Sequence, residues 1–284
     1  MGGLGNQMFQ FAAGFNLASK LNSKLQLNTN LLESPRNINE RTVLRKYDLE
    51  IFDLPKCSLS NKPINNYFLK RQINKLLPYG KKSYLVEKHF HYDPSINSLR
   101  NKNLIMEGYW QSPKYFEDTK EEIKLIFRLS EGDLIQDSKL ILDEIKNSNS
   151  ICLNVRRGDF VNDPLLGTMP LEYYRKAINY FQNKYENTKF FIFSDDIEWC
   201  ENNFKFLMNK RIVGHEHKGY KFKNYLILMK LCKHFIIPNS TFAWWSAFLA
   251  EFEEKEVIVP EKWFKSPYLN SKDLIPGDWK SLIP

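Results

Sequence analysis

The chain has 284 residues, of which 43% are hydrophobic and 14% aromatic, enough to bury a core and too much for a disordered chain. The length favours two compact α/β domains over one large one. Lys and Arg number 41 against 33 Asp and Glu, so the protein should attract anions such as nucleotide sugars, anionic membranes or nucleic acid. Nucleic acid is the weakest of these, because the basic residues are scattered and are not interleaved with aromatic residues on one face.

No apolar run approaches the roughly 18 residues of a membrane span, and the first residues lack the pattern of a signal peptide. We therefore expect a cytoplasmic protein. Its four cysteines, Cys57, Cys152, Cys200 and Cys232, have no CxxC spacing and are expected to be reduced, buried and without chemistry.

The first half of the chain predicts an α/β lobe. A helix is expected over residues 8–21 and strands over 24–28, 84–87 and 104–108. A helix over 134–146 is then expected to join this lobe to a second one. With the boundary at 147–149, the two lobes comprise residues 1–148 and 149–284.

The second half alternates short apolar runs with amphipathic stretches. In chain order, strands are predicted over 150–155, 189–193, 211–213, 234–237 and 256–259, and helices over 170–185, from 196, over 224–233 and over 240–251. Repeated βαβ units of this kind predict a parallel, doubly wound sheet.

Such a sheet binds ligands at the carboxyl ends of its strands, and the first of these ends carries Arg156-Arg157-Gly158-Asp159. Two consecutive guanidinium groups supply fixed donors that suit a diphosphate. Strand alternation places Asn154 on the same face as Arg156. The alternatives are a surface charge pair, or an ion pair between Arg157 and Asp159 that braces the loop.

Ser194-Asp195-Asp196 closes the next strand. The carboxylates could bind guanine or ribose, or they could cap the following helix. No DxD separation and no third ligand is present, so no metal site is predicted.

Asn239-Ser240-Thr241 precedes a helix and places hydroxyl and free N–H groups where a phosphate would sit, with helix capping as the alternative. On that helix, Phe242, Trp244 and Trp245 are predicted to belong to the core or to a cleft wall.

The segment Gly2–Gln7, GGLGNQ, precedes the first predicted helix. Its small residues would let backbone N–H groups face a cleft between the lobes at the positive end of a helix. A tight turn before a helix is the alternative, and the Gly-Lys-Ser/Thr ending of a P-loop is missing.

Six segments in this order resemble one known family: GGLGNQMFQFA, EGYWQSPKYF, NVRRGDF, FFIFSDDIEWC, CKHFIIPNSTFAWW and VIVPEKWF. Together they are similar to the galactoside α-1,2-fucosyltransferases of glycosyltransferase family 11, over residues 2–264. The resemblance implies a GT-B-like α/β fold of two Rossmann-like lobes, with parallel sheets and an interlobe cleft. It also implies GDP-fucose as the donor substrate, inversion at the fucose anomeric carbon, and no metal or other cofactor.

By the same resemblance, Arg156 contacts the β-phosphate and Arg157 supports that site. The acceptor hydroxyl must lose its proton, for which Asp159 is a candidate base or orienting group, with loop bracing as the alternative. The residues predicted to bind the donor are Gly3, Gly5, Asn6, Gln7, Asn154, Ser194, Asp195, Asp196, Asn239, Ser240 and Thr241.

The sequence departs from the family pattern at two places. Asn154 stands where the family usually has His, so it can donate to a phosphate but cannot carry a proton. Family members also carry an apolar strand before GGLGNQ, whereas Met1 directly precedes that segment here. Loss of a first strand would weaken the fold around the segment.

We therefore expect an inverting transferase that moves L-fucose from GDP-fucose to the 2-hydroxyl of a galactose in a cell-surface glycan. Its expected partners are a nucleotide sugar and a galactose-containing glycan, including a lipid-linked one, with peripheral association at the inner face of the membrane left open. The alternatives are a fucosyltransferase of another linkage, a transferase of another GDP-sugar, or a non-catalytic protein that binds a GDP-sugar or a glycan.

Overall fold

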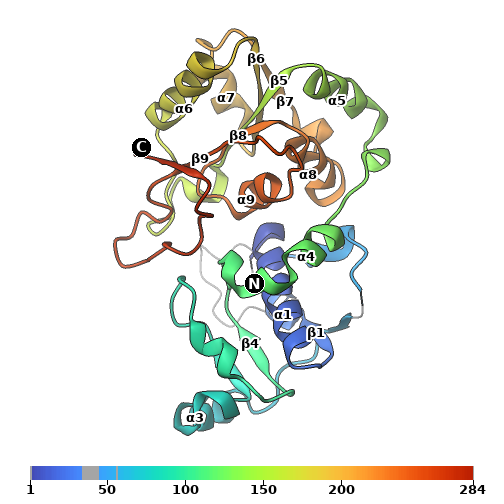
Figure 1. Ribbon diagram of the computed structural model, residues 1–284, viewed down its shortest axis with the longest axis vertical. Coiled ribbons are helices and arrows are strands. Elements are labelled where there is room, and N and C mark those ends of the chain that lie inside the picture. Colours follow the sequence, from blue (N-terminus) through green and yellow to red (C-terminus); the bar gives the residue numbers. More distant parts are fainter. Residues whose placement is uncertain (1, 34–44, 56, 284) are drawn as a thin grey trace. The chain divides into compact units, whose positions relative to one another are not determined.

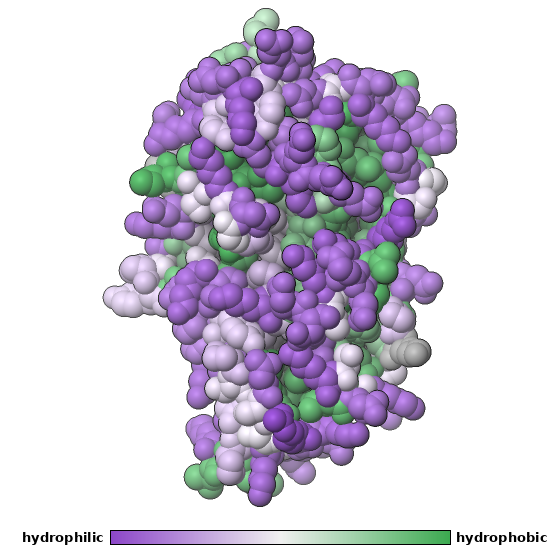
Figure 2. All heavy atoms as spheres, viewed as in Figure 1, coloured by the Kyte–Doolittle hydropathy of each residue, from purple (hydrophilic) through white to green (hydrophobic). Residues whose placement is uncertain are grey.

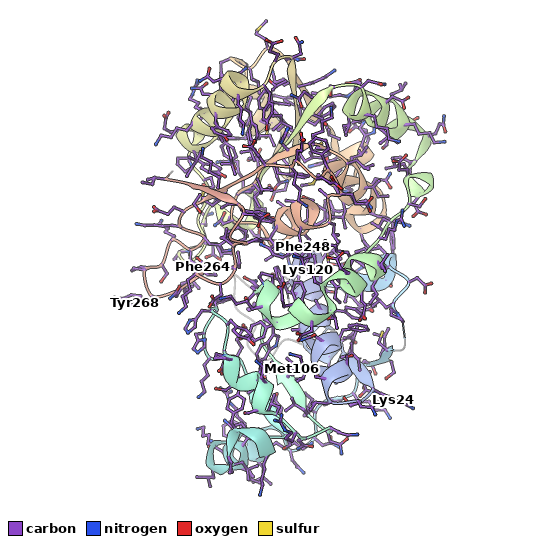
Figure 3. The ribbon with its side chains drawn as sticks, in the orientation of Figure 1. Lys24, Met106, Lys120, Phe248, Phe264 and Tyr268 are labelled. Carbon is purple, nitrogen blue, oxygen red and sulfur yellow. The ribbon has the colours of Figure 1, made fainter. Side chains whose placement is uncertain are left out.

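The computed structural model describes residues 2–33, 45–55 and 57–283 (Figure 1). The chain divides into two compact units. The first runs to Phe127 and also includes Leu269–Ile275, and the second comprises Arg128–Tyr268 and the residues from Pro276 onward. Tyr268, where the chain returns to the first unit, has an exposed side chain (Figure 3).

The units therefore meet in sequence between Phe127 and Arg128, and not after residue 148 as predicted. Helix α5 (Lys139–Lys146), expected to connect the lobes, belongs to the second unit and packs against β5 (Asn149–Val155). Its residues Ile141 and Ile145 are fully buried. Because residues four apart share one helix face, burial of that face makes α5 part of the core beside it.

The return of Leu269–Ile275 to the first unit depends on Asp273. Its carboxylate accepts a hydrogen bond from the Tyr92 N–H at 3.1 Å and pairs with Lys114 Nζ at 2.5 Å. Its backbone carbonyl accepts from the Ser112 hydroxyl at 2.7 Å. These contacts attach the segment Leu269–Ile275 to the first unit.

In the described residues, the second unit holds a six-stranded parallel sheet with the strand order β10-β9-β8-β5-β6-β7. Besides β5, the strands are β6 (Thr188–Ser194), β7 (Lys210–Val213), β8 (His234–Ile236), β9 (Val257–Pro260) and β10 (Lys280–Leu282). Besides α5, the helices are α6 (Leu171–Lys184), α7 (Ile197–Asn203), α8 (Lys223–Lys230) and α9 (Thr241–Phe248). The parallel, doubly wound sheet predicted from the alternating pattern is confirmed.

Strand β5 lies between β6 and β8. From β5 the chain passes through α6 to β6 and through α7 to β7, and then returns through α8 to β8 and through α9 to β9. Because winding in opposite directions places the helices on opposite faces of a parallel sheet, α6 and α8 lie on opposite sides of it (Figure 1). The carboxyl ends of β5 and β8 therefore flank a topological switch point, where sheets of this kind bind ligands.

The position of β5 is fixed by its burial. Ile151, Leu153 and Val155 pack in one cluster with Tyr174 and Ile178 of α6. The intervening residues of β5 are buried as well, as expected for a central parallel strand covered on both faces. Each fully buried aliphatic side chain stabilises the fold by about 1.5–3 kcal/mol. The end of β5, where the loop with Arg156 begins, is therefore held in position.

The strands of the first unit are three or four residues long. Its helices are α1 (Leu4–Lys20), α2 (Asn30–Glu33), α3 (Tyr67–Leu76) and α4 (Lys120–Ile126), and its strands are β1 (Leu25–Asn28), β2 (Cys57–Ser60), β3 (Tyr84–Val86) and β4 (Ile105–Glu107). The strands pair as β1 with β2 and β3 with β4, both parallel, so parallel pairing holds here too. Strand β2 was not predicted, because its residues CSLS are short, polar and only half-buried.

Of the cysteines, Cys152, Cys200 and Cys232 are buried and free as predicted, and Cys57 is only partly buried. Burial raises the pKa of the Cys200 thiol to about 12, so this thiol stays protonated at neutral pH. Within residues 2–33, 45–55 and 57–283, no helix has the length and apolar character needed to cross a membrane.

Glu256, just before β9, provides a test of how α6 is anchored to the sheet. Its carboxylate accepts hydrogen bonds from Tyr180, Lys184 and Tyr185. Burial alone would raise the pKa of Glu256, but these bonds lower it from 4.5 to about 2. Because the folded state has the lower pKa, this stabilisation is complete above pH 4.5 and is lost as the pH falls towards 2.

We therefore expect Glu256→Gln to lower the melting temperature at neutral pH, and the difference from the unmodified protein to shrink as the pH falls from about 5 towards about 2. Thermal unfolding followed by circular dichroism across this range checks the expectation. Glu253→Gln, at an exposed position, is the matched control. A difference between Glu256→Gln and the unmodified protein that is constant with pH would contradict the assignment.

Candidate active site

Three polar segments of the second unit meet at the carboxyl edge of its sheet. In the register of β5 with β6, Val155 lies opposite Ser194, so Arg156 and Asp195 leave the sheet at the same level. In the register of β5 with β8, Leu153 lies opposite Ile236, which brings residues 238–241 to that level on the other side. The sequence predicted these three segments, and the sheet order explains why they converge.

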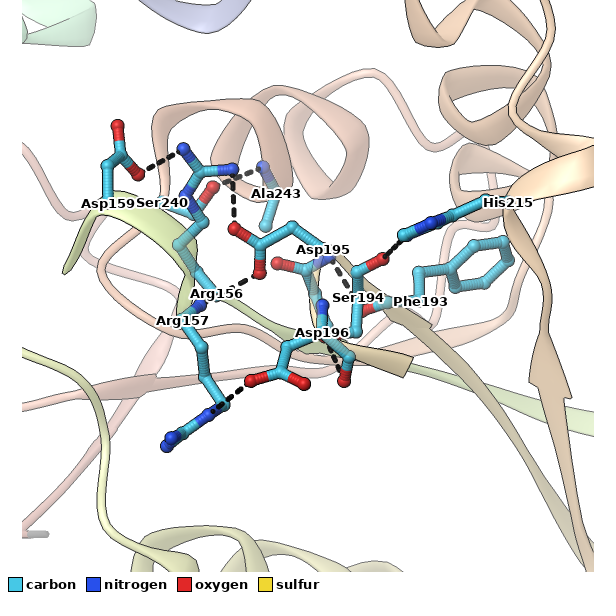
Figure 4. Close-up of polar contacts among 11 residues, drawn as sticks. Arg156, Arg157, Asp159, Phe193, Ser194, Asp195, Asp196, His215, Ser240 and Ala243 are labelled. Carbon is cyan, nitrogen blue, oxygen red and sulfur yellow. Dashed lines mark hydrogen bonds and ion pairs between the residues drawn. The ribbon is translucent and has the colours of Figure 1, made fainter. Parts of the chain in front are cut away.

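Arg156 is held between two carboxylates (Figure 4). One terminal guanidinium nitrogen lies 2.5 Å from Asp159 Oδ1, and the other lies 3.0 Å from Asp195 Oδ2. The guanidinium carbon also lies 5.1 Å from the centre of the Phe160 ring. The side chain is 29% exposed, so an incoming anion can reach it by displacing one of these carboxylates.

Arg157 is bound more firmly to the protein. Its backbone N–H donates to Asp195 Oδ1 at 2.8 Å, and its Nε donates to Asp196 Oδ2 at 2.9 Å. Its guanidinium carbon lies 4.5 Å from the centre of the Trp199 ring. The alternative pairing of Arg157 with Asp159 is not the one observed, because Asp159 pairs with Arg156.

Ser194, Asp195 and Asp196 organise the loop that follows β6. Asp196 Oδ1 accepts from the Trp199 N–H at 3.1 Å and so caps α7, which confirms the capping role considered for this pair. The Ser194 hydroxyl accepts from the Asp196 N–H at 2.9 Å. A Cβ atom at Gly158 would lie 2.5 Å from Asp195 Oδ2, so a larger residue there would displace the Asp195 carboxylate.

The formal charge of this cluster bears on what it can bind. Two arginines face three aspartates, Asp159, Asp195 and Asp196, which sums to −1 and gives no net attraction for an anion. A diphosphate would therefore have to take the place of a carboxylate on one of the arginines. Arg156 is the better candidate, because Arg157 is held in addition by its backbone bond to Asp195 and by the Trp199 ring.

Asn154, at the position usually taken by His in the family that the sequence resembles, is buried. Its Nδ2 donates to the Phe193 carbonyl at 3.1 Å and so links β5 to β6. This contact gives Asn154 a structural role next to Arg156, and its predicted role in donor binding stays a prediction.

Ser240 caps α9, since its hydroxyl accepts from the Ala243 N–H at 3.4 Å. Asn239 Nδ2 donates to the Leu166 and Gly167 carbonyls at 3.0 and 3.2 Å, which anchors the segment after Arg156-Arg157 to the end of β8. Thr241, the first helical residue, is partly exposed. The predicted helix start is therefore present, with the N-terminal end of α9 beside the arginines (Figure 4).

The predicted cluster of Gly3, Gly5, Asn6 and Gln7 lies in the first unit, and the structure corrects its conformation. Helix α1 begins at Leu4 with Gly3 at its N-cap position, so the segment is mostly the first turn of a helix and not a loop ending at residue 7. Gly5 is buried in this turn.

The polar side chains of that turn already have protein partners. Gln7 donates to the Gly2 and Lys46 carbonyls at 3.0 and 2.8 Å and accepts from the Asp48 N–H at 2.8 Å. Asn6 Oδ1 accepts from Gln111 Nε2 at 2.9 Å. These contacts brace the first turn of α1, and a role in donor binding for this turn stays a prediction.

The sequence predictions missed the segment that follows β7. His215 Nε2 lies 3.0 Å from the Ser194 carbonyl (Figure 4). Gly219, Lys221 and Phe222 all have positive φ angles, of 67°, 47° and 63°, which is a costly conformation for the two residues with side chains. Phe222 lies against Phe242 of α9, with ring centroids 6.2 Å apart.

Beneath this strained loop lies Asn224, which is 2% exposed. Its Nδ2 has no hydrogen-bond partner among the described residues. A buried amide without a partner costs about 1–3 kcal/mol. Strand β7 ends at the same edge of the sheet as β5 and β6, so the segment after it was also a candidate for ligand binding. Its glycine and aromatic residues were the sequence signal that could have indicated this.

In the part of the chain that the structure describes, no three His, Cys, Asp or Glu side chains are grouped so as to hold a metal ion. The His89 and His91 rings stack with centroids 3.6 Å apart.

Trp244 and Trp245 are fully buried in the core, as expected.

Comparison with known proteins extends over the whole chain. The model of the family described as glycosyl transferase family 11 matches residues 1–282. An alpha-1,2-colitosyltransferase of Escherichia coli is 33% identical over 285 residues, which cover 98% of this chain and 95% of that protein. The O-antigen biosynthesis glycosyltransferase WbnK of Escherichia coli is 32% identical over 302 residues, covering 99% and 98%. A galactoside 2-alpha-L-fucosyltransferase of Caenorhabditis elegans is 26% identical over 219 residues, covering 68% and 57%.

The contacts of the cluster predict unequal roles for two of its carboxylates. Asp195→Asn removes the ion pair with Arg156 and weakens the bond from the Arg157 N–H, both in a partly buried position. We expect it to lower the free energy of unfolding by about 1–3 kcal/mol. Asp159→Asn, which removes a more exposed pair, should cost at most about 1 kcal/mol. Urea denaturation of both variants measures the difference, and the opposite order would contradict this view of the cluster.

Proposed function

The chain belongs to glycosyl transferase family 11, and on that premise we propose that it transfers L-fucose from GDP-fucose to the 2-hydroxyl of a galactose residue. In this reaction the acceptor oxygen forms a bond to the anomeric carbon of fucose while the bond from that carbon to the β-phosphate oxygen breaks. GDP leaves with the electron pair, and the acceptor proton passes to a base. The configuration at the anomeric carbon is inverted.

The observation that carries the proposal is the pair of consecutive arginines at the switch point of a parallel sheet, in a chain similar along almost its whole length to enzymes of this family. Departure of GDP places negative charge on the diphosphate and positive character on the sugar. Guanidinium groups already fixed in position stabilise that negative charge without reorganisation.

Arg156 binds the β-phosphate in place of Asp159. Arg157, held by Asp195 and Asp196 and stacked on Trp199, positions the loop and contributes its charge. The N-terminal end of α9 supplies backbone N–H groups and the Thr241 hydroxyl to the same phosphates.

Displacement from Arg156 breaks the ion pair between Arg156 and Asp159. A carboxylate that no longer pairs with Arg156 and lies next to the reacting sugar can accept the proton of the acceptor hydroxyl. Binding of the donor would then create the base that the second substrate needs. The protein needs no metal ion for this chemistry, because the arginines provide the positive charge that a cation would otherwise supply.

The nucleoside lies towards the segment after β7. Guanine offers carbonyl and ring-nitrogen acceptors, and Asn224 Nδ2 is a buried donor in need of one. Phe222, which is 45% exposed, offers an aromatic face to the base. The strained backbone at Lys221 and Phe222 would relax as the loop opens to admit the base.

We further propose that the acceptor is a lipid-linked glycan built in the cytoplasm. Support comes from the relative named as an O-antigen biosynthesis glycosyltransferase, to which this chain is similar over 98% of that protein's length.

A second donor is favoured by one observation. The relative that is 33% identical is named as an alpha-1,2-colitosyltransferase, and colitose is L-fucose without its 3-hydroxyl. A site that binds the 3-hydroxyl of fucose discriminates strongly against a donor that lacks it, because its polar groups would then be left unpaired.

The donor can be identified by direct transfer. Purified protein incubated with GDP-fucose, a β-galactoside and EDTA should form an α-1,2-linked product, identified by NMR. GDP-colitose should give a rate lower by at least about tenfold. Faster transfer from GDP-colitose would assign that sugar as the donor, and absence of both transfer and donor hydrolysis by folded protein would contradict the proposal altogether.

The role of Arg156 can be tested separately. Arg156→Ala should lower the transfer rate by at least about 100-fold and weaken GDP binding measured by calorimetry, with an unchanged circular dichroism spectrum. The matched control is Arg175→Ala, which removes an arginine of the same unit that stacks on Phe206 at 3.8 Å. Retention of most of the rate by Arg156→Ala would show that another group holds the diphosphate.

A further inference from the structure

Helix α3 of the first unit is amphipathic, but its apolar side faces solvent. Phe68, Leu69, Ile73 and Leu76 are 72%, 59%, 48% and 89% exposed. At 100° per residue these four side chains fall within one arc of the helix. Figure 2 shows residues coloured as hydrophobic in the region where Figure 1 places α3.

The opposite side of α3 faces the protein and is polar. Asn74, the buried residue of the helix, accepts hydrogen bonds from the N–H groups of Ser83 and Tyr84 at 2.7 and 3.0 Å. Its Nδ2 donates to the Lys70 carbonyl and the Ser83 hydroxyl at 2.7 and 3.2 Å. The amide thus fixes the rotation of α3 about its own axis, and this rotation keeps the apolar arc exposed.

Cations flank the apolar arc. Lys70 follows it on one side, and Arg71 and Lys75 lie on the other, all three exposed. They belong to a longer basic stretch: residues 54–86 contain seven Lys and Arg and no Asp or Glu. The formal charge of this stretch is +7 in a chain whose total is +8, so basic residues that are scattered elsewhere in the sequence are concentrated in this stretch.

We propose that α3, with its flanking cations, is a site that binds an anionic lipid surface. An apolar arc flanked by Lys and Arg is the arrangement by which a helix lies in the plane of a membrane, with its apolar side chains among the acyl chains and its cations at the phosphates. The site binds phospholipid headgroups and acyl chains, and it does not depend on which donor sugar the second unit takes.

A second copy of this chain fits the surface less well. Pairing two such helices would bring two stretches of charge +7 together, and like charges that face each other across an interface oppose association. An anionic bilayer instead neutralises the cations and covers the apolar arc in one step.

The experiment is sedimentation of the full chain with vesicles of phosphatidylglycerol and phosphatidylcholine in equal amounts, compared with vesicles of phosphatidylcholine alone. We expect binding to the anionic vesicles that weakens as salt rises towards about 0.5 M, and little binding to the neutral ones. No binding to anionic vesicles, or equal binding to both kinds, would overturn the proposal.

Two sets of substitutions locate the surface. Lys70→Gln, Arg71→Gln and Lys75→Gln together should lower the partition coefficient on the order of 100-fold, at roughly fivefold for each cation. The control, Lys139→Gln, Lys205→Gln and Lys262→Gln, makes the same change in net charge at exposed positions of the second unit. An equal loss in this control would show that net charge, and not α3, directs binding.

The apolar arc is tested in the same way. Leu69→Ser with Leu76→Ser should weaken binding at least about tenfold, whereas Leu125→Ser with Leu140→Ser, at positions 66% and 68% exposed on α4 and α5, should not. Transfer to a soluble acceptor and the melting temperature should be unchanged in both pairs. If the α3 pair left vesicle binding intact but changed the molar mass measured by light scattering, the occupant would be a second copy and the proposal would be wrong.

Discussion

The central position of β5 is the constraint on which the candidate site depends. Its neighbours β6 and β8 are reached by winding in opposite directions, so the carboxyl end of β5 lies at a topological switch point, where sheets of this kind bind ligands. Because the register places Val155 opposite Ser194, the two arginines and the acidic pair after β6 must meet. The convergence of charged groups follows from the topology, and no single contact produces it.

The ion pairs at this edge hold the arginines in position, but they also compete with an incoming diphosphate. Without a ligand, Asp195 and Asp196 accept hydrogen bonds from the backbone N–H and the Nε of Arg157, and Asp159 pairs with Arg156. Guanidinium groups that are paired in this way stay in place, which spares the reorganisation that free, mobile side chains would undergo when charge develops. The same pairing opposes binding of the diphosphate, because the diphosphate must displace a carboxylate before it can bind.

The sequence predicted the sheet of the second unit well, because buried parallel strands are short continuous apolar runs and the polar segments after them stand out. It did not predict which charges pair, because Arg157 and Asp159 are close in sequence whereas the partners of Arg157 come from the neighbouring strand. The segment around Asn224 was missed, since the glycine and aromatic residues after β7 indicate a loop but reveal neither its strained backbone nor the buried amide without a partner. The outward orientation of α3 was equally hidden, because a periodic apolar arc does not reveal which side of a helix the protein covers.

The segment Leu269–Ile275 has a consequence for how this protein can be divided. The polypeptide passes from one unit to the other three times, after Phe127, after Tyr268 and after Ile275. No single cut therefore yields two complete units. A fragment that ended at Phe127 would lack the Asp273 partner of Lys114 and Ser112, and a chimaera with exchanged specificity would have to import this short segment together with the first 127 residues.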